Sequence, residues 1–132
     1  MSVSSCSPSR AAILTGQPSH QNGMYGLHQA ENHFNSFDDV QSLPSILKKN
    51  KIKTGLIGKK HIGPSSVFSF DYEQTEENHS INQVGRNITK IKLLVREFLN
   101  GTKDDSFFLM VAFHDPHRCG HVRYSIGIPM IN

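Results

Sequence analysis

The chain has 132 residues, the size of a single domain. Its 36% hydrophobic and 19% charged residues are typical of a globular protein, and no apolar run approaches the roughly 20 residues needed to cross a bilayer. The net charge of +3 is small and spread along the chain, so the composition favours neither a membrane-spanning protein nor a nucleic-acid-binding one.

The N-terminal segment predicts a short helix that begins after Pro8 and ends at Gly16. The stretch "SRAAILTG" is largely apolar, and a glycine just past the last apolar residues is a common helix stop. Cys6 therefore lies at or just before the helix N-terminus, where N–H groups and the helix dipole favour an anion, either a thiolate or a bound oxyanion. The polar residues and glycines of 17–36 predict an ordered loop.

A second short helix and a buried strand are predicted in the middle of the chain. Ser42 is suited to cap a helix that has Pro44 in its first turn and runs to Lys49. The apolar run "KTGLIG" predicts a buried strand that ends at Gly58. The lysines and the histidine of residues 59–61 follow directly from the carboxyl end of that strand.

The second half of the chain predicts a long amphipathic helix and another buried strand. Apolar residues at spacings of three or four indicate a helix over residues 81–99 that ends near Asn100. The continuous apolar run "SFFLMVAFH" indicates a strand that is buried on both faces and ends at His114. Alternating helices and strands predict an α/β layered sheet, in which ligand sites gather beyond the carboxyl ends of the strands.

The surroundings of Cys6 leave three interpretations. A free cysteine is most often a small buried hydrophobe, but serines surround this one. A phosphatase-type thiolate needs a longer run of N–H groups between the cysteine and the arginine, and Pro8 has no N–H. The third interpretation is the motif Cys-x-Pro-x-Arg, and the whole stretch "SSCSPSRAAILTG" resembles the signature of the sulfatase family.

The resemblance to sulfatases implies a fold and a chemistry. The fold is an alkaline-phosphatase-like α/β layered sheet, of which this chain would be an N-terminal catalytic part. In sulfatases the cysteine, here Cys6, is oxidised to formylglycine (3-oxoalanine) by a formylglycine-generating enzyme that acts on the unfolded chain. The hydrated aldehyde is both the nucleophile and a ligand of Ca²⁺. Arg10, one helical turn away, would hold the diol through charge-assisted hydrogen bonds.

A second stretch, "GLIGKKHIG", resembles another sulfatase signature. The resemblance implies that Lys59 binds the sulfate oxygens and that His61 hydrogen-bonds a hydroxyl of the diol. In an extended chain, residues two apart face the same side, so Lys59 and His61 can enter one pocket while Lys60 points away. Taken alone, such a tripeptide is more often a solvated turn.

The stretch "FHDPHRCGH" carries four residues of types that bind zinc, namely His114, His117, Cys119 and His121. Their spacings match no common zinc finger, and no second pair lies upstream. In sulfatases a histidine at the end of this strand contacts the sulfate and the leaving group. The resemblance therefore implies that His117 binds substrate and acts as general acid, with His114 as its substitute or else as a structural cap of the strand.

Three Asn-x-Ser/Thr sites, at Asn78, Asn87 and Asn100, favour a protein of the secretory pathway, although chance sites are common. By the resemblance, Asn78 and Asn87 fall where the family carries glycans, and Asn100 is kept as a third acceptor. The sequence begins without a charged and apolar leader, so we expect that its start is missing. The expected location is the lysosome.

Segments such as "HQNGMYGLHQ", "YEQTEEN" and "VGRNITKIKLLVREFL" narrow the resemblance to sulfatases that remove N-linked sulfate from glucosamine residues of heparan sulfate. The likeness covers residues 2–121, and we assign residues 1–121 to part of a sulfatase catalytic domain. Residues 122–132 depart from the family pattern and stay unassigned. Relatives often dimerise, so a homodimer of the complete protein is a further expectation.

The resemblance also implies calcium ligands that this sequence does not contain. Sulfatases use an aspartate pair before the cysteine motif and an Asp-Asn pair far downstream, and one modified Cys6 cannot supply the about six to eight oxygens that calcium takes. Asp38 and Asp39 lie instead in a predicted surface loop ahead of a helix. We expect the isolated chain to be an inactive fragment. The alternative is a noncatalytic truncated product or interaction fragment of a sulfatase.

Overall fold

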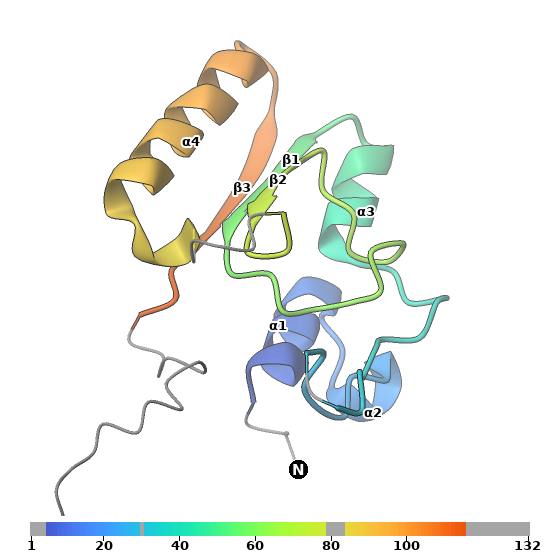
Figure 1. Ribbon diagram of the computed structural model, residues 1–132. Helices are drawn as coiled ribbons and strands as arrows, with labels where there is room; N and C mark the ends of the chain where they lie inside the picture. Colours follow the sequence, from blue (N-terminus) through green and yellow to red (C-terminus); the bar gives the residue numbers. More distant parts are fainter. Residues whose placement is uncertain (1–4, 30, 79–83, 116–132) are drawn as a thin grey trace, which may run out of the picture.

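The computed structural model describes residues 5–29, 31–78 and 84–115 (Figure 1). Three strands, four helices and one short 3-10 turn follow one another in these residues: α1 Cys6–Thr15, α2 Ser19–Asn22, α3 Leu43–Lys49, β1 Lys53–Gly58, β2 Tyr72–Thr75, η1 Val84–Arg86, α4 Ile88–Thr102 and β3 Phe107–Ala112. The predicted α/β class is confirmed. None of the described helices combines the length and the apolar character that crossing a bilayer requires.

The described strands form one parallel sheet in the order β2-β1-β3. Gly58 at the end of β1 is in register with Thr75 at the end of β2 and with Ala112 at the end of β3. The three carboxyl ends therefore meet along one edge, where residues far apart in sequence come together. This is the edge at which open α/β sheets bind their ligands.

The two faces of the sheet pack against different helices (Figure 1). On one face, Leu56 of β1 shares a buried cluster with Leu14 of α1. On the other face, Ile57 packs with Ile91 and Leu94 of α4. Neighbouring residues of β1 thus serve opposite layers, as the alternation of a strand requires. Fully burying one such side chain contributes about 1.5–3 kcal/mol, which fixes β1 between the two layers.

The helix at the start of the chain ends at Gly16 as predicted, but it begins at Cys6 rather than after Pro8. Cys6 is its first residue, Ser5 occupies the N-cap, and Gly16 ends it in the left-handed conformation at φ 68°. The N–H of Gly16 donates to the carbonyl oxygen of Ala12, a bond that glycine provides without steric cost. The prediction for α3 is also confirmed, because Ser42 caps it and accepts the N–H of Ser45.

The segment 17–36 is more ordered than the predicted loop. A single helical turn, α2, lies within it and ends at Gly23, which adopts a φ of 82°. The buried side chain of Asn22 forms hydrogen bonds with the backbone on both sides of the turn. It donates to the carbonyl oxygen of Gln17 and accepts the N–H of Met24, each over 2.9 Å. These side-chain bonds stabilise the turn where the sequence shows no helical periodicity.

The predicted helix over residues 81–99 is corrected at both ends. It begins at Ile88 and ends at Thr102, while residues 81–83 lie outside the described part of the chain. Asn87 decides the start, because its side chain accepts the N–H of Lys90 over 2.9 Å and so caps the first turn. Apolar periodicity alone could not locate this boundary, since Val84 belongs to the separate turn η1.

The strand β3 is shorter and less buried than predicted. It ends at Ala112 rather than His114, and most of its side chains are half-buried instead of covered on both faces. Within the described residues β3 pairs only with β1, so its outer side lies at the edge of the sheet. The strand β2 was not predicted, because its four residues "YEQT" lack an apolar pattern and pairing with β1 defines them.

Candidate active site

A cavity of about 530 Å³ opens at the carboxyl edge of the sheet. Cys6 and Arg10 line it from the first turns of α1, Lys59 from the residue after β1, and His114 from the segment after β3. The structure therefore brings together side chains that lie more than 100 positions apart in sequence. Of the residues singled out from the sequence, His117 falls outside the described residues, as do Cys119 and His121.

Cys6 is a free, half-buried cysteine at the N-terminal end of α1. Its Sγ lies 3.8 Å from Nδ1 of His61. The turn that carries it is anchored by the next residue, because the buried hydroxyl of Ser7 accepts the backbone N–H of His28 over 3.0 Å. The thiol is thus held at the cavity wall, beside an imidazole and the positive end of a helix.

Arg10 fastens α1 to the end of β1. Its Nη1 donates to the carbonyl oxygen of Lys59 over 2.8 Å. Burial lowers the pKa of Arg10, an effect opposed by the negative charges of Glu76 and Cys6. A guanidinium stays protonated in proteins despite such a shift, so Arg10 remains a cation on the cavity wall.

The two lysines after β1 point in different directions, as the alternation of an extended chain predicts. Lys59 lines the cavity although its side chain and backbone together are only 3% exposed. Burial lowers its pKa most, the negative charge of Cys6 raises it, and the positive charge of Arg10 lowers it further. Lys60 instead forms ion pairs with Glu73 over 2.8 Å and Glu77 over 3.5 Å.

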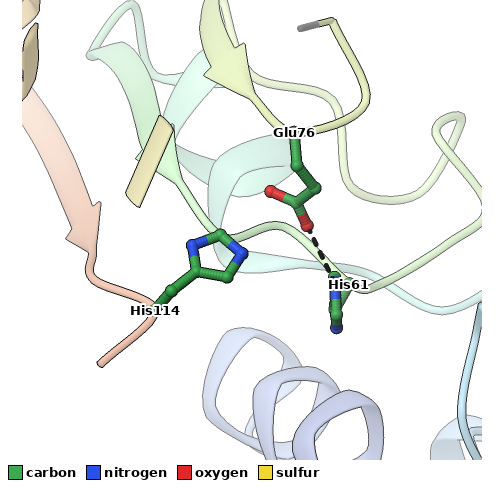
Figure 2. Close-up of side chains that lie close together, drawn as sticks. All are labelled: His61, Glu76 and His114. Atoms are coloured by element: carbon green, nitrogen blue, oxygen red, sulfur yellow. Dashed lines mark ion pairs between the residues drawn. The ribbon is translucent and has the colours of Figure 1, made fainter. Parts of the chain in front are cut away.

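His61 connects Cys6 to the carboxylate of Glu76, a residue that no motif in the sequence marked. Its Nε2 lies 3.2 Å from Oε1 of Glu76 (Figure 2). The backbone N–H of Lys60 donates to both oxygens of the same carboxylate, over 3.0 and 3.1 Å. Burial is the largest influence on the pKa of Glu76 and raises it. The signal that could have located Glu76 is its place directly after β2, at the carboxyl edge of the sheet.

His114 is buried at the same edge. Its backbone N–H donates to the carbonyl oxygen of Gly85 over 3.1 Å, and its ring meets the ring of His61 edge-on with centroids 6.2 Å apart. Gly85 leaves room for that imidazole, because a Cβ there would lie 2.2 Å from Nδ1 of His114. The neighbouring Asp115 forms an ion pair with Arg86 over 2.6 Å.

The described residues do not fit calcium. One atom each of His61, Glu76 and His114 lies within 4.8 Å of the others (Figure 2), a set with two imidazoles and one carboxylate, whereas calcium takes oxygen ligands. Asp38 and Asp39 are exposed, form a turn ahead of α3 and do not line the cavity. The contacts within this group are the pair between His61 and Glu76 over 3.2 Å and the edge-on contact between the rings of His61 and His114.

All three candidate glycosylation sites present exposed asparagines. Asn78 lies in the turn after β2, and Asn87 is the N-cap of α4. Asn100 lies in the last turn of α4, where the threonine of its site, Thr102, is buried and bonds to the carbonyl oxygen of Leu99.

The model of the sulfatase family matches residues 1–125 of the chain. The chain therefore belongs to the sulfatase family. It is 66% identical over 126 residues to human N-sulphoglucosamine sulphohydrolase, a match that covers 96% of this chain and 25% of the human protein. The chain thus spans about a quarter of the length of that relative.

More distant relatives share parts of the same region. The chain is 39% identical over 71 residues to human N-acetylgalactosamine-6-sulfatase, covering 48% of this chain and 14% of that protein. It is 32% identical over 68 residues to the ulvan-active sulfatase of Formosa agariphila, covering 52% of this chain and 13% of that protein. The names of these relatives describe different sulfated substrates, so the matches to them show the sulfatase family and not one substrate.

Proposed function

We propose that this chain is part of an enzyme that hydrolyses sulfamate groups, removing N-linked sulfate from glucosamine residues of heparan sulfate. The observation that carries the proposal is that Cys6, Arg10, Lys59 and His114 line one and the same cavity. The 66% identity to human N-sulphoglucosamine sulphohydrolase supports an N-linked rather than an O-linked sulfate as the substrate.

The first role of the cavity is to bind a tetrahedral anion. Lys59 supplies an almost completely buried ammonium and Arg10 a guanidinium, and both lie beside the N-terminal end of α1. Cations and helix N–H groups in a partly desolvated site attract an anion more strongly than they would in water. In the proposed enzyme Lys59 holds the sulfate oxygens, while Arg10 holds the group at position 6.

The proposed nucleophile is formylglycine, made from Cys6 by a formylglycine-generating enzyme. When hydrated, this aldehyde supplies one hydroxyl that attacks sulfur, so that the S–N bond breaks, and a second hydroxyl whose deprotonation expels sulfate and restores the aldehyde. We assign the removal of that proton to His61, and the 3.8 Å separation of its Nδ1 from Sγ of Cys6 supports the assignment.

The departing nitrogen must gain a proton as the S–N bond breaks. We keep His117 as the proposed general acid and substrate ligand, and His114 as its substitute. The buried position of His114 on the cavity wall, next to the ring of His61, supports a histidine-rich site at the end of β3. An imidazole suits this role because the ordinary pKa of histidine lies near the pH at which enzymes work.

The remaining features of the proposal belong to the complete protein. They are a calcium ion that assists the hydrated aldehyde, passage through the secretory pathway to the lysosome, glycans at Asn78, Asn87 and Asn100, and a homodimer. The exposure of the three asparagines supports the glycans. The assignment of residues 1–121 to the catalytic domain and of 122–132 to a divergent tail stays a prediction.

The test is to express the complete protein, of which this chain is a part, through the secretory pathway and to measure two quantities. Peptide mass spectrometry measures formylglycine at position 6, and an N-sulfated glucosamine substrate measures hydrolysis. We expect modified protein to be active and Cys6→Ala to be inactive. Active protein that carries only unmodified cysteine would refute the mechanism. Fully modified protein without hydrolysis would favour the second candidate, a noncatalytic product of a sulfatase gene.

A further inference from the structure

The side chain of Glu76 contacts two consecutive residues of the segment after β1, Lys60 and His61. Its carboxylate accepts the backbone N–H of Lys60 on both oxygens, over 3.0 and 3.1 Å, and its Oε1 lies 3.2 Å from Nε2 of His61. Because Thr75 is in register with Gly58, pairing of β2 with β1 delivers Glu76 to this point. The carboxylate is therefore oriented by a hydrogen bond to the backbone, whose position the sheet fixes.

The backbone of His61 also depends on this arrangement. His61 has a φ of 47°, in the left-handed region that residues with a side chain rarely adopt. Such a conformation persists where surrounding contacts over-determine it. Here Glu76 holds the preceding N–H and the imidazole at once, while the ring of His114 packs edge-on against the ring of His61 (Figure 2).

We propose that Glu76 is a positioning residue that keeps the hydrogen of neutral His61 on Nε2, so that Nδ1 presents its lone pair to position 6. An ionised carboxylate only accepts hydrogen bonds, so Nε2 beside it must donate. Nδ1, 3.8 Å from Sγ of Cys6, is then the acceptor that can take a proton from the group there. The inference rests on the proposed function for its catalytic consequence, but not for the hydrogen position itself.

The competing arrangement is a protonated Glu76 that donates to Nε2 and leaves the hydrogen on Nδ1. Burial acts in that direction, since it favours the neutral carboxyl group. The N–H of Lys60 and the positive charge of Arg10 act in the opposite direction, because they stabilise the carboxylate. The double contact of the Lys60 N–H with both oxygens leads us to choose the ionised form.

The hydrogen position is measured on the whole chain by long-range proton–nitrogen correlation spectra of the His61 ring, at a pH where the imidazole is neutral. We expect the Nε2–H form in the wild type and a mixture of both forms in Glu76→Gln. Glu77→Gln is the matched control, because Glu77 is the next carboxylate along the chain and pairs with the Lys60 ammonium over 3.5 Å. This control is expected to keep the wild-type ring spectrum.

Two results would overturn the inference: an Nδ1–H form in the wild type, or an unchanged Nε2–H form in Glu76→Gln. Should Glu76→Gln fail to fold, the wild-type spectrum alone decides. In the complete enzyme, Glu76→Gln is expected to lower kcat about 100-fold with little change in KM, at the lower end of the range of acid–base contributions. A failure of the formylglycine mechanism would leave the ring spectrum unaffected, so the two failures are distinguishable.

Discussion

Arg10 donates from Nη1 to the carbonyl oxygen of Lys59 over 2.8 Å, and this bond joins the helix that carries Cys6 to the strand end that carries the buried ammonium. The contact spans 49 positions of sequence. It means that the spacing between the proposed nucleophile and the proposed anion ligand is fixed by a side chain that belongs to the cysteine motif itself.

The first prediction concerns that bond. Arg10→Lys keeps a positive charge but removes the planar fork, so the variant is expected to lose about 1–2 kcal/mol of unfolding free energy. Urea unfolding of the chain measures the difference. Arg96→Lys on the exposed face of α4 is the control and should change stability by less than about 0.5 kcal/mol. Equal effects of the two substitutions would mean that the Arg10 bond contributes nothing specific.

The second prediction concerns anion binding. Lys59→Met replaces the buried ammonium with an apolar chain of similar length, and the affinity for inorganic sulfate should fall about tenfold for one lost charge-assisted contact. Titration of sulfate followed by NMR measures the affinity. Lys92→Met, an exposed lysine of α4, should leave it unchanged. An unaltered affinity in Lys59→Met would remove this residue from the proposed anion site.

The third prediction compares two glycines. A Cβ at Gly85 would lie 2.2 Å from Nδ1 of His114 and 3.0 Å from the carbonyl oxygen of Ala112, so Gly85→Ala should destabilise by about 1–3 kcal/mol. At Gly101, in the last turn of α4, a Cβ would meet only the flexible Lys53 ammonium at 3.6 Å. Gly101→Ala should therefore stabilise by about 0.5–1 kcal/mol. Thermal unfolding of both variants checks the opposite signs.

The fourth prediction is a pH dependence. Burial, followed by the charge of Glu97, raises the pKa of Tyr72 from 10.0 to about 12. A group whose pKa is raised by folding contributes stability below its unfolded pKa and loses it as the pH rises through the folded value. The unfolding free energy should therefore fall between pH 10 and 12. Tyr72→Phe should show a shallower fall in urea titrations, and an identical slope would contradict the assignment.

The fifth prediction separates two roles of Asn87. Asn87→Asp keeps an oxygen that caps α4 but removes the glycosylation site, whereas Asn87→Ala removes both and should cost about 1 kcal/mol of stability. Intact-mass measurement of secreted protein should show the loss of one glycan in both variants. A secreted wild type without a glycan at this position would refute the proposed site, with the capping result unaffected.

Caps, helix stops and apolar runs in the sequence predicted the helices and the strand that depend mainly on neighbouring residues. Gly16 ended α1, Ser42 capped α3, and the apolar run before Gly58 formed β1. The strand β2 escaped prediction because its residues are polar and take strand geometry only by pairing with β1. The start of α4 was misplaced because the side-chain cap of Asn87 outweighs apolar periodicity.

In the candidate site too, residues within sequence motifs were predicted and residues brought in by strand pairing were not. The family signatures identified Cys6, Arg10, Lys59 and His61, and strand alternation separated Lys59 from Lys60. Glu76 had no signature, and its relevance depends on a register between two strands that the sequence alone does not reveal. The contact between His61 and His114 likewise depends on the pairing of β1 with β3, which no local pattern encodes.

Because Ser7 and Pro8 are buried in the first turn of α1, the proposed modification of Cys6 has to occur before this part of the chain folds. In the proposed mechanism, a modifying enzyme that acts on the unfolded Cys-x-Pro-x-Arg stretch would lose access to Cys6 once Arg10 donates to the carbonyl oxygen of Lys59. Because that contact needs a long loop to close, it forms later than local helices do. In the proposed mechanism, oxidation of Cys6 therefore has to precede tertiary folding, and a variant that folds faster is expected to carry less formylglycine.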